Sequence, residues 1–248
     1  MSKQTGLGDN LYVGGYNVSG DVGSLSRIGG GPALLEVTGI DKSAVERLGA
    51  VRDGAIDFTS FFNDAALQEH VALSGLATTD VLISYFRGTT LGNQAAGLNA
   101  KQVNYDATRG QDGSLTFDVN AVANGFGIEF GRSLTAGVRT DTGATSGSSI
   151  DYGAAIGQTT LGAQAYLQVF TFTGTDVTIT VQDSTNDSAW ASLVAFTAVT
   201  SGPTTERVAT TASTTVDRYI RVTTSTTGGF SDLDFAVLVV KNETATVF

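Results

Sequence analysis

Apolar and polar residues alternate along short segments of this chain, and this alternation restricts its fold more than any other feature. Between residues 114 and 122, Leu115, Phe117 and Val119 fall on one side of an extended strand, and polar residues fall on the other. The chain has 31 glycines and 2 prolines, and its many Ser and Thr residues often alternate with Val, Ile, Leu and Phe. This combination favours short strands and tight turns over long helices. We therefore predict a mainly β protein.

The same alternation predicts further strands in the first half of the chain. In residues 54–62, Ile56, Phe58 and Phe62 share one face, while Asp57 and Thr59 share the other, where Phe61 interrupts the polar pattern. Such a pattern is typical of a half-buried strand. The other strands predicted in this half span residues 80–87, 99–107, 114–122 and 126–132; in the last of these, Phe126, Ile128 and Phe130 are expected on the core side and Glu129 on the polar side.

Two short helical segments are also predicted. Asp64 stands at a suitable N-cap position for a helix over residues 65–74, where Leu67 and Val71 repeat at helical spacing. Ser43 and Glu46 form a capping-box pattern of modest specificity for a helical turn over residues 44–48. The first half is therefore expected to be a β-sandwich or barrel with one flanking helix.

The first 32 residues are rich in glycine and hold only short apolar groups. An isolated subunit would gain little by ordering such a segment, so we interpret it either as a frayed terminus or as an arm that a partner covers. On the second interpretation, deleting about the first 20 residues spares folding. Residues 88–98 are interpreted as a mobile loop, either a plain surface loop or a contact between copies.

Composition shifts along the chain predict two domains. The first spans residues 1–140, including the arm at 1–32, and residues 141–154 form a linker in which Gly, Ser, Thr and Asp dominate and periodicity disappears. Residues 155–248 are then expected to form a second β-sandwich, Ig-like or jelly-roll-like. Its clearest strands span residues 166–172, 177–182, 219–223 and 235–240.

The composition excludes several classes of function. A net charge of −10 argues against a protein held to nucleic acid by phosphate contacts, which needs clustered Lys and Arg. The chain has no cysteine, so disulfides and thiolate metal sites are impossible, and its one histidine, His70, is interpreted as a surface or packing residue. No GxSxG or P-loop signature occurs, no signal peptide is visible, and no apolar run is long enough to span a membrane. We predict no enzymatic activity, no cofactor and no metal.

Two features of the second half have both a plain and a functional interpretation. The run Asp183–Ser188 resembles a calcium loop only in composition, and a hairpin turn rich in Asx and Ser residues is the favoured alternative. Trp190 is flanked by apolar residues and is expected to pack inside the second core, although an exposed Trp could bind sugar.

One long run carries a family resemblance. It comprises Gly29-Gly30-Gly31-Pro32-Ala33-Leu34-Leu35-Glu36-Val37-Thr38-Gly39-Ile40-Asp41, then Ser43-Ala44-Val45-Glu46-Arg47-Leu48, then Arg52-Asp53-Gly54-Ala55-Ile56-Asp57-Phe58, followed by the helix-like segment 65–73. Over roughly residues 1–135 the chain resembles the major tail (tail tube) proteins of long-tailed bacteriophages with non-contractile, siphovirus-type tails. The run as a whole is fairly specific, but no single residue in it is diagnostic.

The resemblance implies a structural virion protein. Its copies would form hexameric rings that stack into the tail tube, the conduit for genome delivery. Other tail proteins would be its partners (tape measure, terminator and distal tail proteins), and DNA would pass without specific binding. The protein would be synthesised in the host cytoplasm and reside in the virion tail, with the second domain outside the tube.

The resemblance also suggests roles for particular residues. Asp57, Asp118 and Glu129 lie on the predicted polar faces of strands. They are expected to face the lumen, where negative charge repels phosphate at short range. Contacts between rings are expected to involve the arm and the 88–98 loop, through Leu11, Tyr12, Val13, Leu91 and Asn93.

Two other functions fit the composition. A surface adhesion or carbohydrate-binding protein would use the second domain, and exposure of Trp190 beside Tyr219 or Phe230 would distinguish it. A capsid decoration protein would instead form trimers on a shell.

Overall fold

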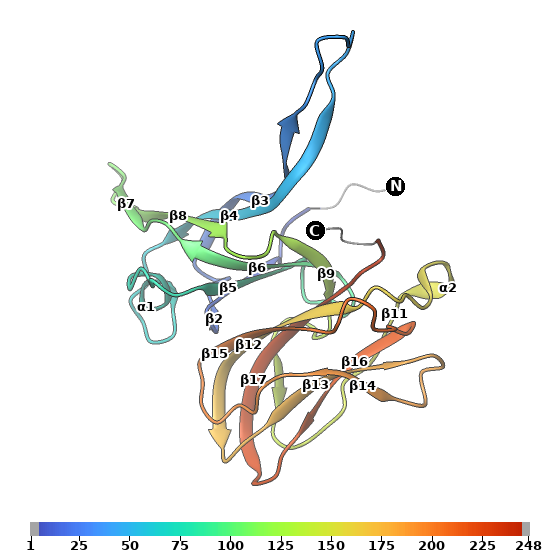
Figure 1. Ribbon diagram of the computed structural model, residues 1–248. Coiled ribbons are helices and arrows are strands. Elements are labelled where there is room, and N and C mark those ends of the chain that lie inside the picture. The colour runs from blue at the N-terminus through green and yellow to red at the C-terminus, as the bar shows by residue number, and fades with distance from the viewer. Residues whose placement is uncertain (1–4, 245–248) are drawn as a thin grey trace.

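The computed structural model describes residues 5–244, so the first residues of the predicted arm and the last of the second domain lie outside the described part. The protein is mainly β, as predicted (Figure 1). Two sheets contain the strands, and the two helices among residues 5–244 are short: α1 (Glu69–Leu73) and α2 (Gly153–Ile156). Neither is long and apolar enough to cross a membrane.

The larger sheet runs through both halves of the chain. Its main path has the order β15-β12-β17-β9-β6-β5-β1-β2. The strands of this path are β15 (Thr204–Ala209), β12 (Ala163–Gly174), β17 (Phe230–Lys241), β9 (Glu129–Ser133), β6 (Gln94–Gln102), β5 (Val81–Phe86), β1 (Asn10–Val13) and β2 (Tyr16–Asn17). The strands that branch from it are β10 (Arg139–Asp141), which pairs with β17, and β8 (Leu115–Ala123), β4 (Arg47–Phe61), β3 (Val22–Glu36) and β7 (Asp106–Arg109).

The smaller sheet covers one face of the larger sheet in the second half of the chain. Its order is β11-β16-β13-β14, with β11 (Ile150–Asp151), β16 (Tyr219–Ser225), β13 (Thr178–Ser184) and β14 (Ala191–Ala195). Apolar side chains of both sheets fill the space between them, as expected for the predicted second β-sandwich. The proposed linker 141–154 contributes β11, and the predicted domain boundary itself stays a prediction.

Separate apolar clusters support the first half. One lies beneath β3, β4, β8 and β6 and includes Ile56, Phe58 and Val119. Another joins the halves, because Tyr12 packs edge-on against Phe86 at 5.2 Å and against Phe170 at 5.0 Å between ring centroids.

Both helix predictions need correction. Residues 44–48 are not helical: residues 37–46 close a long hairpin between β3 and β4, in which the Glu46 amide donates to the Thr38 hydroxyl. The predicted helix 65–74 is reduced to α1, because Leu67 has φ +64° and cannot continue a right-handed helix. Asp64 is not the N-cap of this helix. The N-cap of α1 is Gln68, and the Gln68 side chain makes no capping hydrogen bond.

Part of the predicted arm belongs to the core. Leu11, Tyr12 and Val13 are buried in β1, which pairs with β5. The structure argues against the expectation that removing about 20 residues spares folding, because the deletion would take away β1, β2 and the buried Val18. Sequence reasoning missed this because the partner strand β5 lies some 70 residues away.

The alternation predicted for residues 126–132 is broken at Glu129, because Ile128 is buried as predicted but Glu129 beside it is buried as well. Its side chain is only 5% exposed, whereas Phe126 and Phe130 are 45% and 60% exposed. Glu129 is ion-paired to Arg207 of β15 with two N–O distances of 2.9 Å, and it accepts a hydrogen bond from the Tyr166 hydroxyl of β12. Burial alone would lower the pKa of Arg207, but its hydrogen bonds to Glu129 raise it. The arginine is thus held in its charged form.

We expect the Arg207→Met substitution to lower the free energy of unfolding by about 3–5 kcal/mol, because it leaves the Glu129 carboxylate buried without a counter-charge. Urea denaturation followed by circular dichroism measures this. The double variant with Glu129→Met should recover much of the loss, and Arg109→Met on exposed β7 should stay within about 0.5 kcal/mol of the wild type. Equal stability of the Arg207 and Arg109 variants would contradict this assignment.

A second prediction concerns Asp183, which is buried in β13 and accepts a hydrogen bond from the Asp217 amide at 2.8 Å. Burial raises the pKa of Asp183 above its ordinary value. The unfolded chain therefore releases this proton at lower pH than the folded chain, so the carboxyl lowers stability as pH rises from the unfolded towards the folded pKa. We expect Asp183→Asn to be more stable than the wild type at pH 7 and to lose this advantage in acid. Thermal melts across pH 3–8 measure the difference, and a stability gain confined to acid would contradict the prediction.

Candidate assembly surface

Four strands of the first half form a sheet with two open edges. The order is β3-β4-β8-β7, with β4 and β7 on opposite sides of β8. Among residues 5–244, β3 pairs only with β4 and β7 pairs only with β8. The outer edges of both strands therefore carry backbone groups without a ladder partner, which is how strands recruit another chain.

One face of this sheet is mainly polar, although exposed Phe61 and Val122 also lie on it. The register places Asp57 opposite Asn120, Thr59 opposite Asp118, and Asp106 opposite Asp118. Because directly opposed residues share a face, these side chains lie together. The Thr59 hydroxyl donates a hydrogen bond to the Asp118 carboxylate at 2.7 Å, and the side-chain amide of Asn104 donates to the Asp106 carboxylate at the same distance.

The face is acidic in balance. It carries Asp57, Asp106 and Asp118, and the register adds Arg27 opposite Asp57, with Lys101 of neighbouring β6 opposite Val122 and paired to Asp80. The reverse face packs Ile56, Phe58, Val119 and Ala121 into the core. The sheet is thus one-sided, as the alternation in residues 54–62 and 114–122 predicts.

The three residues predicted to face a lumen do not lie together. Asp57 and Asp118 share the polar face, and that they line a channel stays a prediction. Glu129 is buried against Arg207 and presents no charge to that face. Its placement on a polar strand face was an error, because the sequence does not show a counter-ion 78 residues away.

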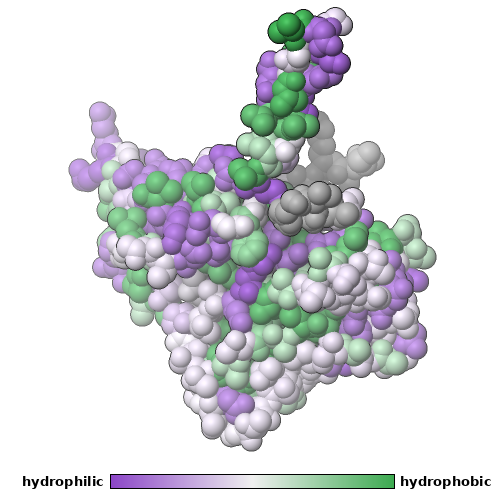
Figure 2. Space-filling view, in the orientation of Figure 1, coloured by the Kyte–Doolittle hydropathy of each residue, from purple (hydrophilic) through white to green (hydrophobic). Residues whose placement is uncertain are grey.

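The outer part of the β3–β4 hairpin leaves the body of the protein (Figure 1). Pairing of β4 with β8 ends at Ala55, so residues 31–52 contact only each other along their ladder. This hairpin tip, as we name residues 31–52, exposes many large apolar side chains, visible as green patches in Figure 2. They are Leu34, Leu35, Val37, Ile40, Val45, Leu48 and Val51. Exposed apolar surface of this extent indicates a contact with another molecule.

Two glycines, Gly30 on β3 and Gly54 on β4, stand where the hairpin tip joins the sheet, and we call this pair the glycine waist. A Cβ atom on Gly30 would lie 2.2 Å from the Asp53 carbonyl oxygen, and one on Gly54 would lie 2.7 Å from the Ile128 amide. Only glycine permits such close approach of backbones. The waist therefore needs glycine on both strands of the hairpin.

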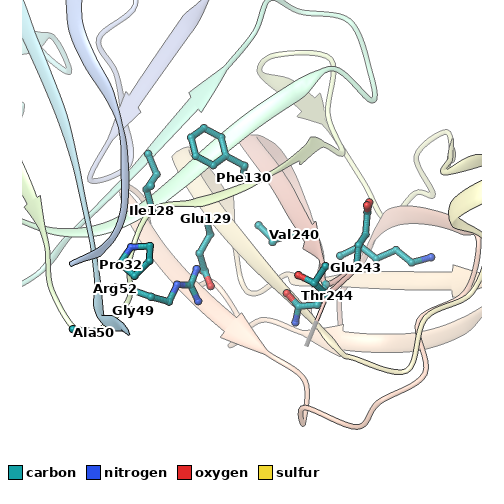
Figure 3. Close-up of a pocket in the computed structure, with 12 residues that line it drawn as sticks. Pro32, Gly49, Ala50, Arg52, Ile128, Glu129, Phe130, Val240, Glu243 and Thr244 are labelled. Atoms are coloured by element: carbon teal, nitrogen blue, oxygen red, sulfur yellow. The ribbon is translucent and has the colours of Figure 1, made fainter. Parts of the chain in front are cut away.

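A cleft of about 670 Å³ opens beside the waist (Figure 3). Pro32, Ala50 and Arg52 of the hairpin form one wall, and the end of β17 with the residues after it forms another. Phe130 also lines the cleft and is 60% exposed. The cleft thus combines an accessible aromatic ring with charged groups.

The residues predicted to make contacts between rings are placed elsewhere. Leu11, Tyr12 and Val13 are buried, so they cannot meet another copy in this conformation. Leu91 packs against the core of the sandwich. The side-chain amide of Asn93 donates a hydrogen bond to the Arg87 carbonyl at 2.7 Å. The hairpin tip is the surface that sequence reasoning missed, because an expected helical turn concealed a continuous pair of strands.

The side chains considered for chemistry have structural partners. His70 lies 3.0 Å from the Tyr105 hydroxyl, which donates to buried Glu69, and it packs edge-on against Phe62. In the loop 183–188, the Asn186 side-chain oxygen accepts bonds from the amides of Ser188 and Ala189, as in an Asx turn. No group of metal-ligating side chains occurs within the part of the chain that the structure describes.

Trp190 is not a core residue. It is half-buried, and the guanidinium of Arg221 lies 4.1 Å from its ring centroid. The prediction that it packs inside the second core is wrong. Its apolar neighbours in the sequence gave no sign that an arginine 31 residues away would cover it.

Comparison with known proteins gives limited likenesses. No protein-family model and no curated protein matches the sequence. The similar solved structures include the virion of a native gene transfer agent particle, at 16% identity and TM-score 0.42, over 52% of this chain and 98% of that chain. The SPP1 Dit (gp 19.1) protein is similar at 12% identity and TM-score 0.31, and the match covers 94% of this chain and 98% of that chain. The phage p2 baseplate in its activated conformation with Sr, at 9% identity and TM-score 0.31, is covered over 95% and 99%. TM-scores this low establish no shared function.

Proposed function

We propose that this protein is a structural subunit of a phage-type tail tube. Copies join edge to edge into hexameric rings, and the rings stack into a conduit for genome delivery. The observation that carries the proposal is the sheet β3-β4-β8-β7, which ends in an open edge on each side and has one polar face. The sequence resemblance over residues 1–135 supplies the ring and the tube.

The position of the two edges supports a head-to-tail contact between copies. The free edge of β3 and the free edge of β7 are different surfaces at opposite ends of one sheet, so a contact between them is head-to-tail. Such heterologous contacts generate closed rings when the rotation between copies closes. A groove of about 600 Å³ lies beside β3, and polar residues such as Asp9 and Ser19 line it together with Val22, Leu25 and Ile28.

In such a ring the polar faces of all sheets would line a common channel. Asp57 and Asp118, with Asp106 beside them, would place negative charge there. At physiological salt this charge acts over about 8 Å. It would repel DNA phosphates at the wall and keep DNA from adhering while it passes.

Stacking of rings would use the hairpin tip instead of the arm and the 88–98 loop. Its exposed apolar side chains have no cover in the single subunit, and the glycine waist carries them away from the body. A copy in the next ring would bury them, and the cleft beside Phe130 provides a surface for that contact.

The remaining parts of the proposal come from the resemblance. The tape measure, terminator and distal tail proteins are the expected partners, and the assembled virion tail is the expected location. No reaction and no cofactor is part of this function. A capsid decoration protein is the alternative that shares the composition, and it would form trimers.

Negative-stain electron microscopy of the concentrated protein tests the ring. We expect six-fold rings or tubes with an axial hole. Trimers without rings would favour the decoration alternative and count against the tube.

A second experiment tests the hairpin tip. Leu35 and Leu48 are directly opposite each other in β3 and β4 and are both 56% exposed. We expect the double variant Leu35→Ser/Leu48→Ser to fold, to lose no more than about 1 kcal/mol of stability, and to form rings but not tubes. Val103→Ser, which removes a 62% exposed apolar side chain from the body, is the matched control and should assemble normally. Tubes of normal length from the double variant would exclude the hairpin tip as the stacking contact.

A further inference from the structure

The two outer edges of the β3-β4-β8-β7 sheet carry opposite charges on its polar face. Figure 1 shows the four strands in the order β7, β8, β4, β3 from left to right. Arg27 of β3 lies on the polar face, because it is directly opposite Asp57, and Asp106 of β7 lies there opposite Asp118. Arg27 and Asp106 are both exposed. One edge is therefore positive on this face, and the other edge is negative.

The single subunit provides no cation for Asp106. Asp106 and Asp118 are directly opposed in the register, and like charges in opposed positions destabilise a sheet. Each carboxylate accepts one hydrogen bond from a neutral side chain, Asn104 for Asp106 and Thr59 for Asp118. Neither forms an ion pair with a Lys or Arg of residues 5–244. This edge of the sheet thus lacks a positive charge that a second molecule can supply.

Arg27 has the complementary property. Although it stands opposite Asp57, the two form no ion pair. Within the described range 5–244, its guanidinium group also makes no hydrogen bond. Arg27 can therefore bind a carboxylate beyond the edge of β3 without losing a bond inside its own subunit.

The directions of the strands allow the two edges to meet. Neighbouring strands are antiparallel throughout this sheet, so β7 runs antiparallel to β3. A copy rotated about an axis that runs along the strands keeps these directions, and its β7 would extend the sheet beside β3 as another antiparallel strand.

The register brings the two charges within reach of each other. Arg27 is level with Asp57, whereas Asp106 is level with Asp118 and Thr59, which is one step of two residues along the strands. Across a joint without stagger they would be diagonal neighbours at about 7–8 Å, a separation that long side chains bridge.

The charges also distinguish this joint from the other possible edge pairings. A joint of β3 with a second β3 would bring two Arg27 side chains to one interface. A joint of β7 with a second β7 would add another Asp106 to the opposed carboxylates. Only the joint of β3 with β7 combines opposite charges, and like charges across an interface disfavour the wrong partner.

We propose that Arg27 of one copy forms an ion pair with Asp106 of a second copy of this chain, and that this pair selects the head-to-tail joint. The inference rests on the proposed ring and names the contact that gives it direction. Each joint then carries one such pair on the polar face. Asp57 and Asp118 keep their negative charge there.

Reversal of either charge tests the pair. Arg27→Asp and Asp106→Arg each place like charges at every joint, so each variant should need at least a tenfold higher protein concentration for half-maximal assembly. The double variant Arg27→Asp/Asp106→Arg restores opposite charges and should assemble as the wild type does. Sedimentation velocity and mass photometry measure the oligomers. Added salt should reduce the difference between the wild type and the single variants, because it screens exposed charges.

A mixture of the two single variants gives a sharper test. The altered β3 edge of Arg27→Asp fits the altered β7 edge of Asp106→Arg, and the unaltered edges of the two variants also fit each other. We therefore expect an equimolar mixture to assemble at the wild-type concentration into oligomers in which the variants alternate, although each variant alone does not.

The control is Asp187→Arg on the sandwich, which makes the same change of charge as Asp106→Arg at an exposed position away from both edges. It should assemble as the wild type does. Circular dichroism and thermal melts establish that every variant is folded.

The outcomes separate this inference from the proposed ring. Wild-type rings that neither single variant impairs would overturn the ion pair and leave the ring in place. Impaired single variants that neither the double variant nor the mixture rescues would do the same. A wild type that forms only dimers would indicate pairing of two like edges and overturn the ion pair, and one that stays monomeric at every concentration would overturn the ring as well.

Discussion

The buried contact of Glu129, Arg207 and Tyr166 is the interaction on which the rest of the structure depends. It joins β9, at the junction of the two halves, to β12 and β15 of the sandwich. The Arg207 guanidinium also lies 3.7 Å from the centroid of the Phe126 ring. Because β9 pairs with both β6 and β17, this contact fixes the position at which the sheet passes from one half to the other.

A continuous sheet connects the two halves. The β3-β4-β8-β7 sheet is attached through β6, which also pairs with β9, and β9 pairs with β17 of the sandwich. The smaller sheet packs on this larger sheet through the apolar core between them. Backbone hydrogen bonds of one sheet therefore run through both halves.

The sequence predicted elements whose environment is set by near neighbours. The strand 114–122 was predicted with its buried and exposed sides in place, because Leu115, Phe117 and Val119 alternate with polar residues and turns flank them. Failures arose where a distant partner decides the environment. Glu129 was predicted at the surface because the sequence does not show its ion pair with Arg207. Residues 10–13 were predicted to be an arm because the sequence does not show their pairing with β5. The pattern Ser43–Glu46 indicated a helix, but backbone pairing of the flanking strands has priority over so short a local signal.

The candidate surfaces were predicted only in part. Asp57 and Asp118 follow from alternation, which is a local property. The apolar hairpin tip could not be predicted in this way. The sequence shows that Leu34, Leu35 and Leu48 are apolar, but it does not show that the folded subunit leaves them exposed. Trp190 gave the same difficulty, since a ring covered by an arginine and a ring in a core have similar neighbours along the chain.

The glycine waist has a consequence for the direction in which the hairpin tip points. A side chain at Gly30 would meet the Asp53 carbonyl, and one at Gly54 would meet the Ile128 backbone, so neither position can accept a larger residue without a shift of the backbone. Such a shift at the base of a long lever moves its far end by much more than it moves the body. The aim of the apolar tip, and with it the match to whatever surface it meets, therefore depends on two residues that never touch that surface.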